Sequence, residues 1–74
     1  MNKIRVALDT QSDVREFVNI ANSINSFVYL EDGTGFRVDA KSLLGVMYGM
    51  GEFKSLYVLS DYEHISTKFN KFMM

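Results

Sequence analysis

The fold is decided in one stretch of the sequence, Ser26-Phe27-Val28-Tyr29-Leu30-Glu31-Asp32-Gly33-Thr34-Gly35-Phe36-Arg37-Val38. The first six residues are rich in β-branched and aromatic side chains, which favour a strand, and residues 36–38 continue in the same way. Between these two runs, Asp32 to Gly35 is a strong turn signal, because both glycines can adopt a positive φ. The stretch therefore predicts a β-hairpin.

Two elements are expected upstream of the hairpin. Ile4, Val6 and Leu8 alternate with charged or small residues, and this period of two predicts a half-buried strand over residues 2–8. The short oxygen-bearing side chains of residues 9–12 then supply N-cap chemistry for a helix. The apolar stripe on one face of this helix consists of Val14, Phe17, Val18, Ala21 and Ile24.

The segment that follows the hairpin predicts a short apolar helix. Asp39 or Ser42 can cap it, and Gly49 and Gly51 are expected to stop it. A short helix on one face of a sheet keeps one side in solvent, so part of its apolar set should be exposed as a surface for a protein partner. The alternative is that the whole set fills the core. The set consists of Leu43, Leu44, Met47, Tyr48 and Met50.

The last third of the chain predicts one more strand and one more helix. The strand spans residues 56–59, and Asp61 is expected to cap a helix with Ile65, Phe69 and either Phe72 or Met73 on one side. The element order is then β-α-β-β-α-β-α over a single domain, residues 1–74. This order predicts an α+β open-faced sandwich, in which three helices cover one face of a four-stranded antiparallel sheet.

Composition excludes several classes of function. The 74 residues carry 8 Lys or Arg and 9 Asp or Glu, a net charge of −1, with no Cys and one His. A disulfide scaffold, a cysteine-based zinc site, a thiol nucleophile and a multi-histidine metal site are excluded, and we expect no cofactor. The near-neutral charge argues against nucleic-acid binding. No apolar run suits a membrane span or a signal peptide, so a cytoplasmic location is expected.

Few side chains are candidates for catalysis. Asp9 and Asp13 could form an acid–base or cation-binding pair, but helix capping and the helix dipole explain both. His64 has no neighbour that would complete a catalytic constellation, so a surface histidine is expected. A second possibility is an aromatic platform that stacks RNA bases on the open face of the sheet, although cross-strand packing is the expected role of these rings. They are Phe27, Tyr29, Phe36 and Tyr57.

A longer motif lies at the start of the apolar helix: Ala40-Lys41-Ser42-Leu43-Leu44-Gly45-Val46-Met47. It resembles the regulatory-serine segment of HPr, the histidine-containing phosphocarrier of the bacterial sugar phosphotransferase system, which typically reads A/L-K-S-[ILM]-[ML]-G-[VL]-[ML]. The β-α-β-β-α-β-α order is also that of the HPr fold. The resemblance implies a bacterial protein connected with sugar transport and carbon catabolite regulation.

The resemblance also implies particular roles for residues around this motif. Ser42 aligns with the serine that a dedicated kinase phosphorylates in HPr, although the bare N-cap role remains the alternative. Leu43, Leu44 and Met47, with Lys41 nearby and Tyr48 following, match the surface on which the family docks enzymes and a transcriptional regulator.

The departure from the family lies after the first strand. HPr carries its phosphorylated histidine there, in a segment like G-[IL]-H-x-R-P-A, whereas residues 8–15 of this chain contain no Gly, His or Pro. Asp9 or Thr10 falls nearest the histidine, and Ser12 falls near the family's arginine. Neither Thr nor Asp replaces an imidazole in a phosphohistidine relay. Asp9, Thr10 and Ser12 are therefore interpreted as a degenerate active-site loop.

Together these observations predict a protein that is not an enzyme. The first hypothesis is an HPr-like regulatory or adaptor protein that binds protein partners through its second helix and is switched by phosphorylation of Ser42. The partners implied are phosphotransferase-system enzymes, an HPr-type kinase or a transcriptional regulator. Two alternatives remain: a phosphocarrier that uses a residue near Thr10, and a degenerate structural or dimerisation module. Both a monomer and a homodimer are consistent with the sequence.

Overall fold

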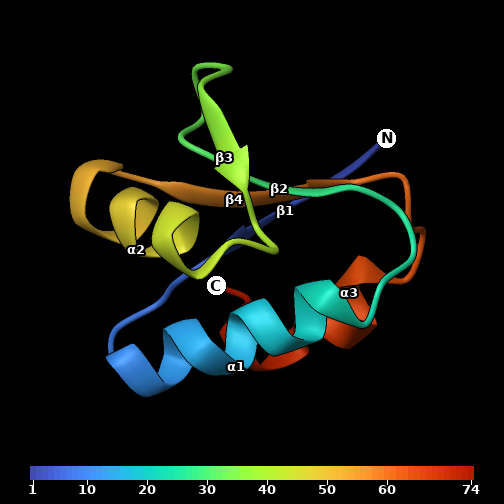
Figure 1. Cartoon of the computed structure of the whole chain (residues 1–74). Coiled ribbons are helices and arrows are strands. Elements are labelled where there is room, and N and C mark those ends of the chain that lie inside the picture. Colours follow the sequence, from blue (N-terminus) through green and yellow to red (C-terminus); the bar gives the residue numbers. More distant parts are fainter.

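The computed structural model describes every residue from 1 to 74 and contains four strands, three α-helices and a short 3₁₀-helix (Figure 1). In chain order the elements are β1 (Asn2–Val6), α1 (Gln11–Asn22), β2 (Val28–Glu31), β3 (Arg37–Asp39), α2 (Leu43–Glu52), β4 (Leu56–Ser60), α3 (Ile65–Lys68) and the 3₁₀-helix η1 (Asn70–Phe72).

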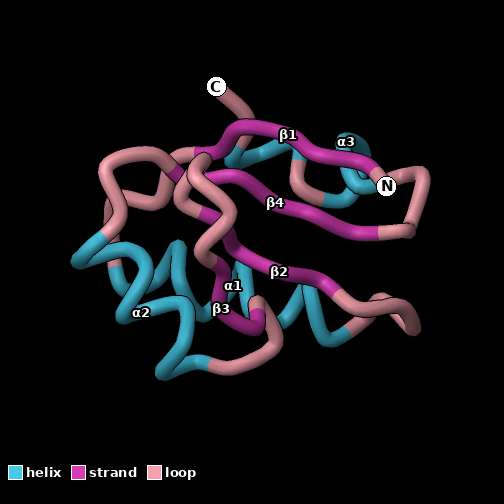
Figure 2. Tube along the Cα trace, turned by 90° about the horizontal axis from the view of Figure 1, so that it is seen from above, coloured by secondary structure: helices cyan, strands magenta, loops and turns pink.

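The four strands form one antiparallel sheet in the order β1-β4-β2-β3. Val58 at its centre pairs with Ile4 on one side and with Leu30 on the other. Figure 2 shows the strands in this order, and Figure 1 shows all three helices on the same side of the sheet. The predicted α+β open-faced sandwich is confirmed.

The β2–β3 hairpin follows from its turn residues. Gly33 and Gly35 adopt φ values of 93° and 106°, the conformation for which glycine was expected. Asp32 Oδ1 accepts hydrogen bonds from the backbone N–H and the hydroxyl of Thr34, both at 2.7 Å. The first of these holds the pKa of the Asp32 carboxyl below its usual value. The turn is therefore stabilised by its own side chains.

The core lies between the sheet and the helices and has an aromatic centre. Phe17 of α1 and Phe69, which follows α3, are both fully buried, with ring centroids 4.9 Å apart. Phe72 completes the cluster, 5.9 Å from Phe17 in an edge-to-face arrangement. Such tilted and edge-on contacts are favourable for aromatic pairs beyond the area they bury. This cluster fixes the C-terminal segment to α1.

The opposite face of the sheet is covered by its own charged side chains. The Lys3 ammonium lies 2.8 Å from Glu31 and 4.9 Å from the centre of the Tyr57 ring, and Arg37 lies 5.2 Å from the centre of the Tyr29 ring. Each tyrosine thus has a cation over its ring. The rings that could have formed a stacking platform are engaged within the chain.

The first strand is shorter than expected, and the reason is a contact with the C-terminus. β1 ends at Val6 rather than at residue 8, and its pairing with β4 ends there. The Ala7 N–H donates instead to the Phe72 carbonyl at 2.8 Å, and Val6 bridges to Met73. A contact between residues more than 60 positions apart leaves no signal in the local alternation.

The expected ends of the last two helices are also wrong. α2 continues through Gly49 and Gly51 to Glu52. Gly49 is buried, and a Cβ at this position would lie 2.9 Å from Leu30 Cδ2. Gly49 therefore permits close packing on the sheet rather than ending the helix. Asp61 does not cap α3, which starts at Ile65 with His64 in the N-cap position and no side-chain hydrogen bond.

A matched pair of valine variants tests this role of Gly49. Gly49→Val should lower the free energy of unfolding by about 1–3 kcal/mol, because the added atoms would also meet the Phe53 ring, 3.0 Å from the Cβ position. Gly51→Val should stay within about 0.5 kcal/mol of wild type, since no atom lies within 4 Å of its Cβ position. Urea unfolding of both variants measures the difference, and equal stabilities would contradict the packing role.

Candidate functional site

The exposed apolar side chains of the protein are concentrated on one surface. Of eight large hydrophobic residues that are exposed, three are the terminal residues Met1, Met73 and Met74. The other five lie on α2 and at the adjacent end of the hairpin, and we call this surface the α2 patch. It consists of Phe36, Leu43, Leu44, Met47 and Tyr48.

The patch forms because α2 has no charged residue before Glu52. Val46 and Gly49 turn into the core and are fully buried or nearly so, which leaves the opposite side of the helix in solvent. Leu44 on that side is 79% exposed. Met50, which the sequence also placed among the candidates for exposure, is partly buried and packs against the core. Four of the five candidates on this helix are therefore exposed.

A groove borders the patch where α2 meets the start of α1. It has a volume of about 210 Å³ and is lined by Gln11, Val14, Arg15, Leu43 and Met47. Leu43 and Met47 supply the apolar wall on α2, and the exposed Arg15 supplies a cation on α1 with no carboxylate within ion-pair distance. The groove therefore offers apolar contact next to a free guanidinium.

The other border of the patch is aromatic. The Phe53 ring lies nearly perpendicular to those of Phe36 and Tyr48, with centroid distances of 5.8 Å and 6.2 Å. Phe36 does not belong to the possible stacking platform, because it precedes β3 and packs on the end of α2 instead. Sequence reasoning placed neither Phe36 nor Phe53 beside α2, and no local pattern marks a contact between the hairpin and the end of a helix.

The Ser42 side chain caps α2. Its hydroxyl oxygen accepts a hydrogen bond from the Gly45 N–H at 3.1 Å, the geometry of an N-cap. Lys41 lies next to it, but its ammonium donates to the Ile24 carbonyl at 2.6 Å. Lys41 is thus bound to the segment after α1 rather than presented on the α2 patch.

The residues of the degenerate loop form the start of α1. Thr10 is the N-cap, and its hydroxyl accepts from the Asp13 N–H at 3.0 Å. Asp13 Oδ2 accepts in return from the N–H groups of Asp9 and Thr10, at 2.9 Å and 3.2 Å. This is a capping box. Asp9 and Ser12 are exposed, and neither makes a side-chain hydrogen bond.

The capping box predicts a pH dependence of stability. The N–H of Asp9, assisted by that of Thr10 and by the charge of Lys71, holds the pKa of the Asp13 carboxyl below its ordinary value of 3.8. A lowered folded-state pKa means that the stabilisation is complete above the unfolded-state pKa and is lost as the pH falls through the folded-state value. Urea unfolding of Asp13→Asn and wild type should show a stability difference that shrinks below about pH 4. A difference that is constant with pH would contradict this.

Other features of the chain form no constellation. His64 is exposed, with its Nε2 3.8 Å from Glu63 and its ring 5.6 Å from that of Tyr62. No group of three or more His, Asp or Glu side chains is placed to hold a metal ion. None of the helices has the length and apolar character needed to cross a bilayer.

Comparison with known proteins gives no relative. No protein-family model matches the chain, and neither a curated protein nor a solved structure matches it.

Proposed function

We propose that this chain is a non-catalytic, HPr-like regulatory or adaptor protein that binds a protein partner through the α2 patch. The observation that carries the proposal is that all five exposed large hydrophobics outside the termini lie on this one surface. Clustered exposed Leu, Met and aromatic side chains mark protein-binding surfaces. The resemblance of residues 40–47 to HPr supports a connection with the phosphotransferase system.

The partner that fits this surface offers apolar side chains and a carboxylate. The groove beside Leu43 and Met47 has room for one apolar side chain, and Arg15 at its edge has no ion-pair partner within the chain. A carboxylate on the partner would find five N–H donors there. Enzymes of the phosphotransferase system, an HPr-type kinase and a transcriptional regulator are the candidate partners that the resemblance implies.

The start of α1 supports a non-catalytic role. The hydroxyl oxygen of Thr10 and Oδ2 of Asp13 are engaged in the capping box, and residues 8–15 contain no imidazole. The alternative, a phosphocarrier that uses Asp9, Thr10 or Asp13, is tested with the first enzyme of the phosphotransferase system and phosphoenolpyruvate. We expect no phosphorylated product by intact mass, and an acid-labile adduct would favour the alternative.

Phosphorylation of Ser42 is the proposed switch. A phosphate at this N-cap would meet the free N–H groups and the positive dipole end of α2, and it would add negative charge beside Leu43. Incubation with HPr kinase and ATP should add one phosphate to the wild type and none to Ser42→Ala, as read by intact mass. No phosphate on the wild type, or equal labelling of both proteins, would refute the switch and leave the adaptor role standing.

The dimerisation alternative uses an unpaired edge of the sheet, whose outer strands are β1 and β3. A monomeric adaptor should show a constant molecular mass by light scattering over a concentration series. A mass that doubles with concentration in both wild type and Leu44→Lys would favour self-association through a sheet edge, whereas doubling in wild type alone would indicate self-association through the α2 patch.

A further inference from the structure

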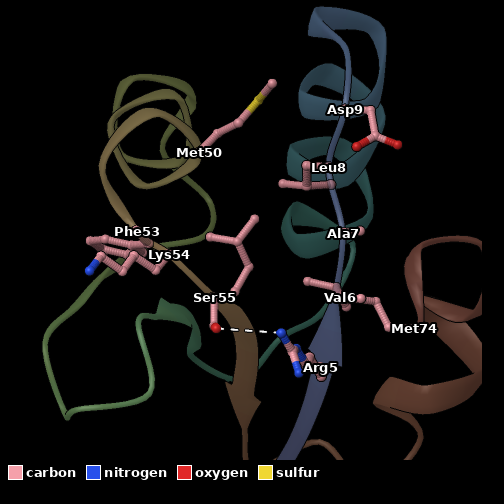
Figure 3. Close-up of a pocket in the computed structure, with 11 residues that line it drawn as sticks. Arg5, Val6, Ala7, Leu8, Asp9, Met50, Phe53, Lys54, Ser55 and Met74 are labelled. Carbon is pink, nitrogen blue, oxygen red and sulfur yellow. Dashed lines mark hydrogen bonds between the residues drawn. The ribbon is translucent and has the colours of Figure 1, made fainter.

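A cavity of about 260 Å³ lies where β1 and β4 separate (Figure 3). The last pair of the two strands is Val6 with Leu56, and beyond it residues 7–9 and 53–55 line the cavity. No backbone hydrogen bond joins these two segments. The cavity is thus the open end of a strand pair, and none of the residues of the α2 patch lines it.

One charged group points into this space. Figure 3 shows the Arg5 guanidinium reaching across from β1 towards Ser55, whose hydroxyl oxygen lies 3.5 Å from Nη2. No carboxylate lies within ion-pair distance of Arg5. The charged ends of Lys54 and Asp9, which also line the cavity, point away from it (Figure 3). The space is therefore suited to an anion.

The rest of the cavity is lined by apolar side chains and by backbone groups of Leu8 and Ser55. Leu8 and Met50 extend from opposite sides into the gap between β1 and α2 (Figure 3), and Phe53 and Leu56 also line the cavity. The backbone groups of Leu8 and Ser55 take part in no backbone hydrogen bond. A ligand in this space can therefore use an apolar group and an amide in addition to its negative charge.

We propose that this cavity binds an organic carboxylate that carries one apolar side chain and an amide. The Arg5 guanidinium pairs with the carboxylate, the hydroxyl of Ser55 donates to it, and Leu8 and Met50 contact the apolar group. The amide of the ligand meets the backbone groups of Leu8 and Ser55, which make no backbone hydrogen bond. A volume of about 260 Å³ limits the ligand to the size of one or two amino-acid residues. Two sources supply this chemistry: a small N-acylated amino acid, or the apolar C-terminal residue of a peptide.

N-acetyl-leucine is the probe, and N-acetyl-leucine amide is its uncharged control. In a titration followed by backbone amide NMR, the acid should shift the signals of Leu8 and Ser55 with a Kd on the order of 1 mM, as expected for a ligand of its size. The amide should bind at least about tenfold more weakly, because it lacks the charge that pairs with Arg5. Absence of shifts at the cavity, or equal binding of acid and amide, would overturn the proposal.

Two matched variants test whether Arg5 or Lys54 supplies the positive charge that binds the carboxylate of N-acetyl-leucine. Arg5→Gln should weaken binding of N-acetyl-leucine at least about tenfold, whereas Lys54→Gln should change it less than about twofold, since the Lys54 ammonium points away. Both positions are exposed, and the amide spectra of the variants report whether the fold is retained. Equal losses in the two variants would show a non-specific charge effect and would refute the role of Arg5.

A leucine-terminated hexapeptide distinguishes the two sources. Binding at least about tenfold tighter than that of N-acetyl-leucine would assign the site to a chain terminus, because the preceding residues would add contacts beyond those of the terminal residue. Equal affinity would assign it to the small acid. Both results support the shared chemistry, and neither depends on the α2 patch.

Discussion

Leu44→Lys is expected to weaken partner binding at least about 100-fold while leaving the fold intact. Leu44 is the most exposed residue of the α2 patch, at 79%, so its removal should cost little stability. In a docked complex, however, a lysine would bury an unpaired ammonium against apolar groups of the partner. Losses of this size are typical of residues at the centre of an interface. Calorimetric titration with an HPr-type kinase measures the affinity.

Met74→Lys is the matched control for this variant. Met74 is 73% exposed, close to the value for Leu44, but it lies outside the patch. The same change of an exposed apolar side chain to lysine should therefore leave the affinity within about twofold of wild type. If Leu44→Lys bound as wild type does, or if both variants lost affinity equally, the α2 patch would not be the docking surface.

Phe69→Ala is expected to lower the free energy of unfolding by about 3–5 kcal/mol, a large part of the stability of the fold. A stability of roughly 0.05–0.15 kcal/mol per residue predicts about 4–11 kcal/mol for a chain of this length. Removing a buried Phe costs about 3–5 kcal/mol, through lost burial and the cavity that remains. Phe69 is fully buried and its ring contacts that of Phe17, so the alanine variant leaves a cavity in the core that water does not fill. Circular dichroism during urea unfolding measures the loss.

Phe36→Ala is the control for the aromatic core. Phe36 is 54% exposed, so its removal should lower the free energy of unfolding by less than about 1 kcal/mol. Similar losses in the two variants would contradict the assignment of Phe69 to the core and of Phe36 to the surface.

The element order and the sheet could be predicted from the sequence because their signals are local. The two glycines of the hairpin, the alternation in the first strand and the apolar stripe of α1 each depend on residues close together in the chain. The element ends could not be predicted, since they depend on distant contacts. The hydrogen bond from Ala7 to Phe72 and the packing of Gly49 on Leu30 are examples.

Some features of the candidate site could likewise be predicted from the sequence, whereas others depend on contacts between distant segments. The sequence predicts that part of the apolar set on α2 is exposed, because an uncharged helix covers one face of a sheet, but it does not single out Leu44 and Tyr48. The contact of Phe36 with Phe53 and the hydrogen bond of Lys41 to Ile24 depend on how the hairpin and α1 meet α2. The cavity beside Arg5 depends on where two strands separate, which no single segment encodes.

The central claim is that the chain binds a protein partner through the α2 patch. Its most direct test is a titration of the ¹⁵N-labelled chain with unlabelled HPr-type kinase, followed by backbone amide NMR. The proposal predicts that the largest signal changes fall on residues 43–48 and on Arg15 across the groove, with β1 unaffected. Signal changes centred on the open face of the sheet, or no changes at saturating kinase, would contradict it.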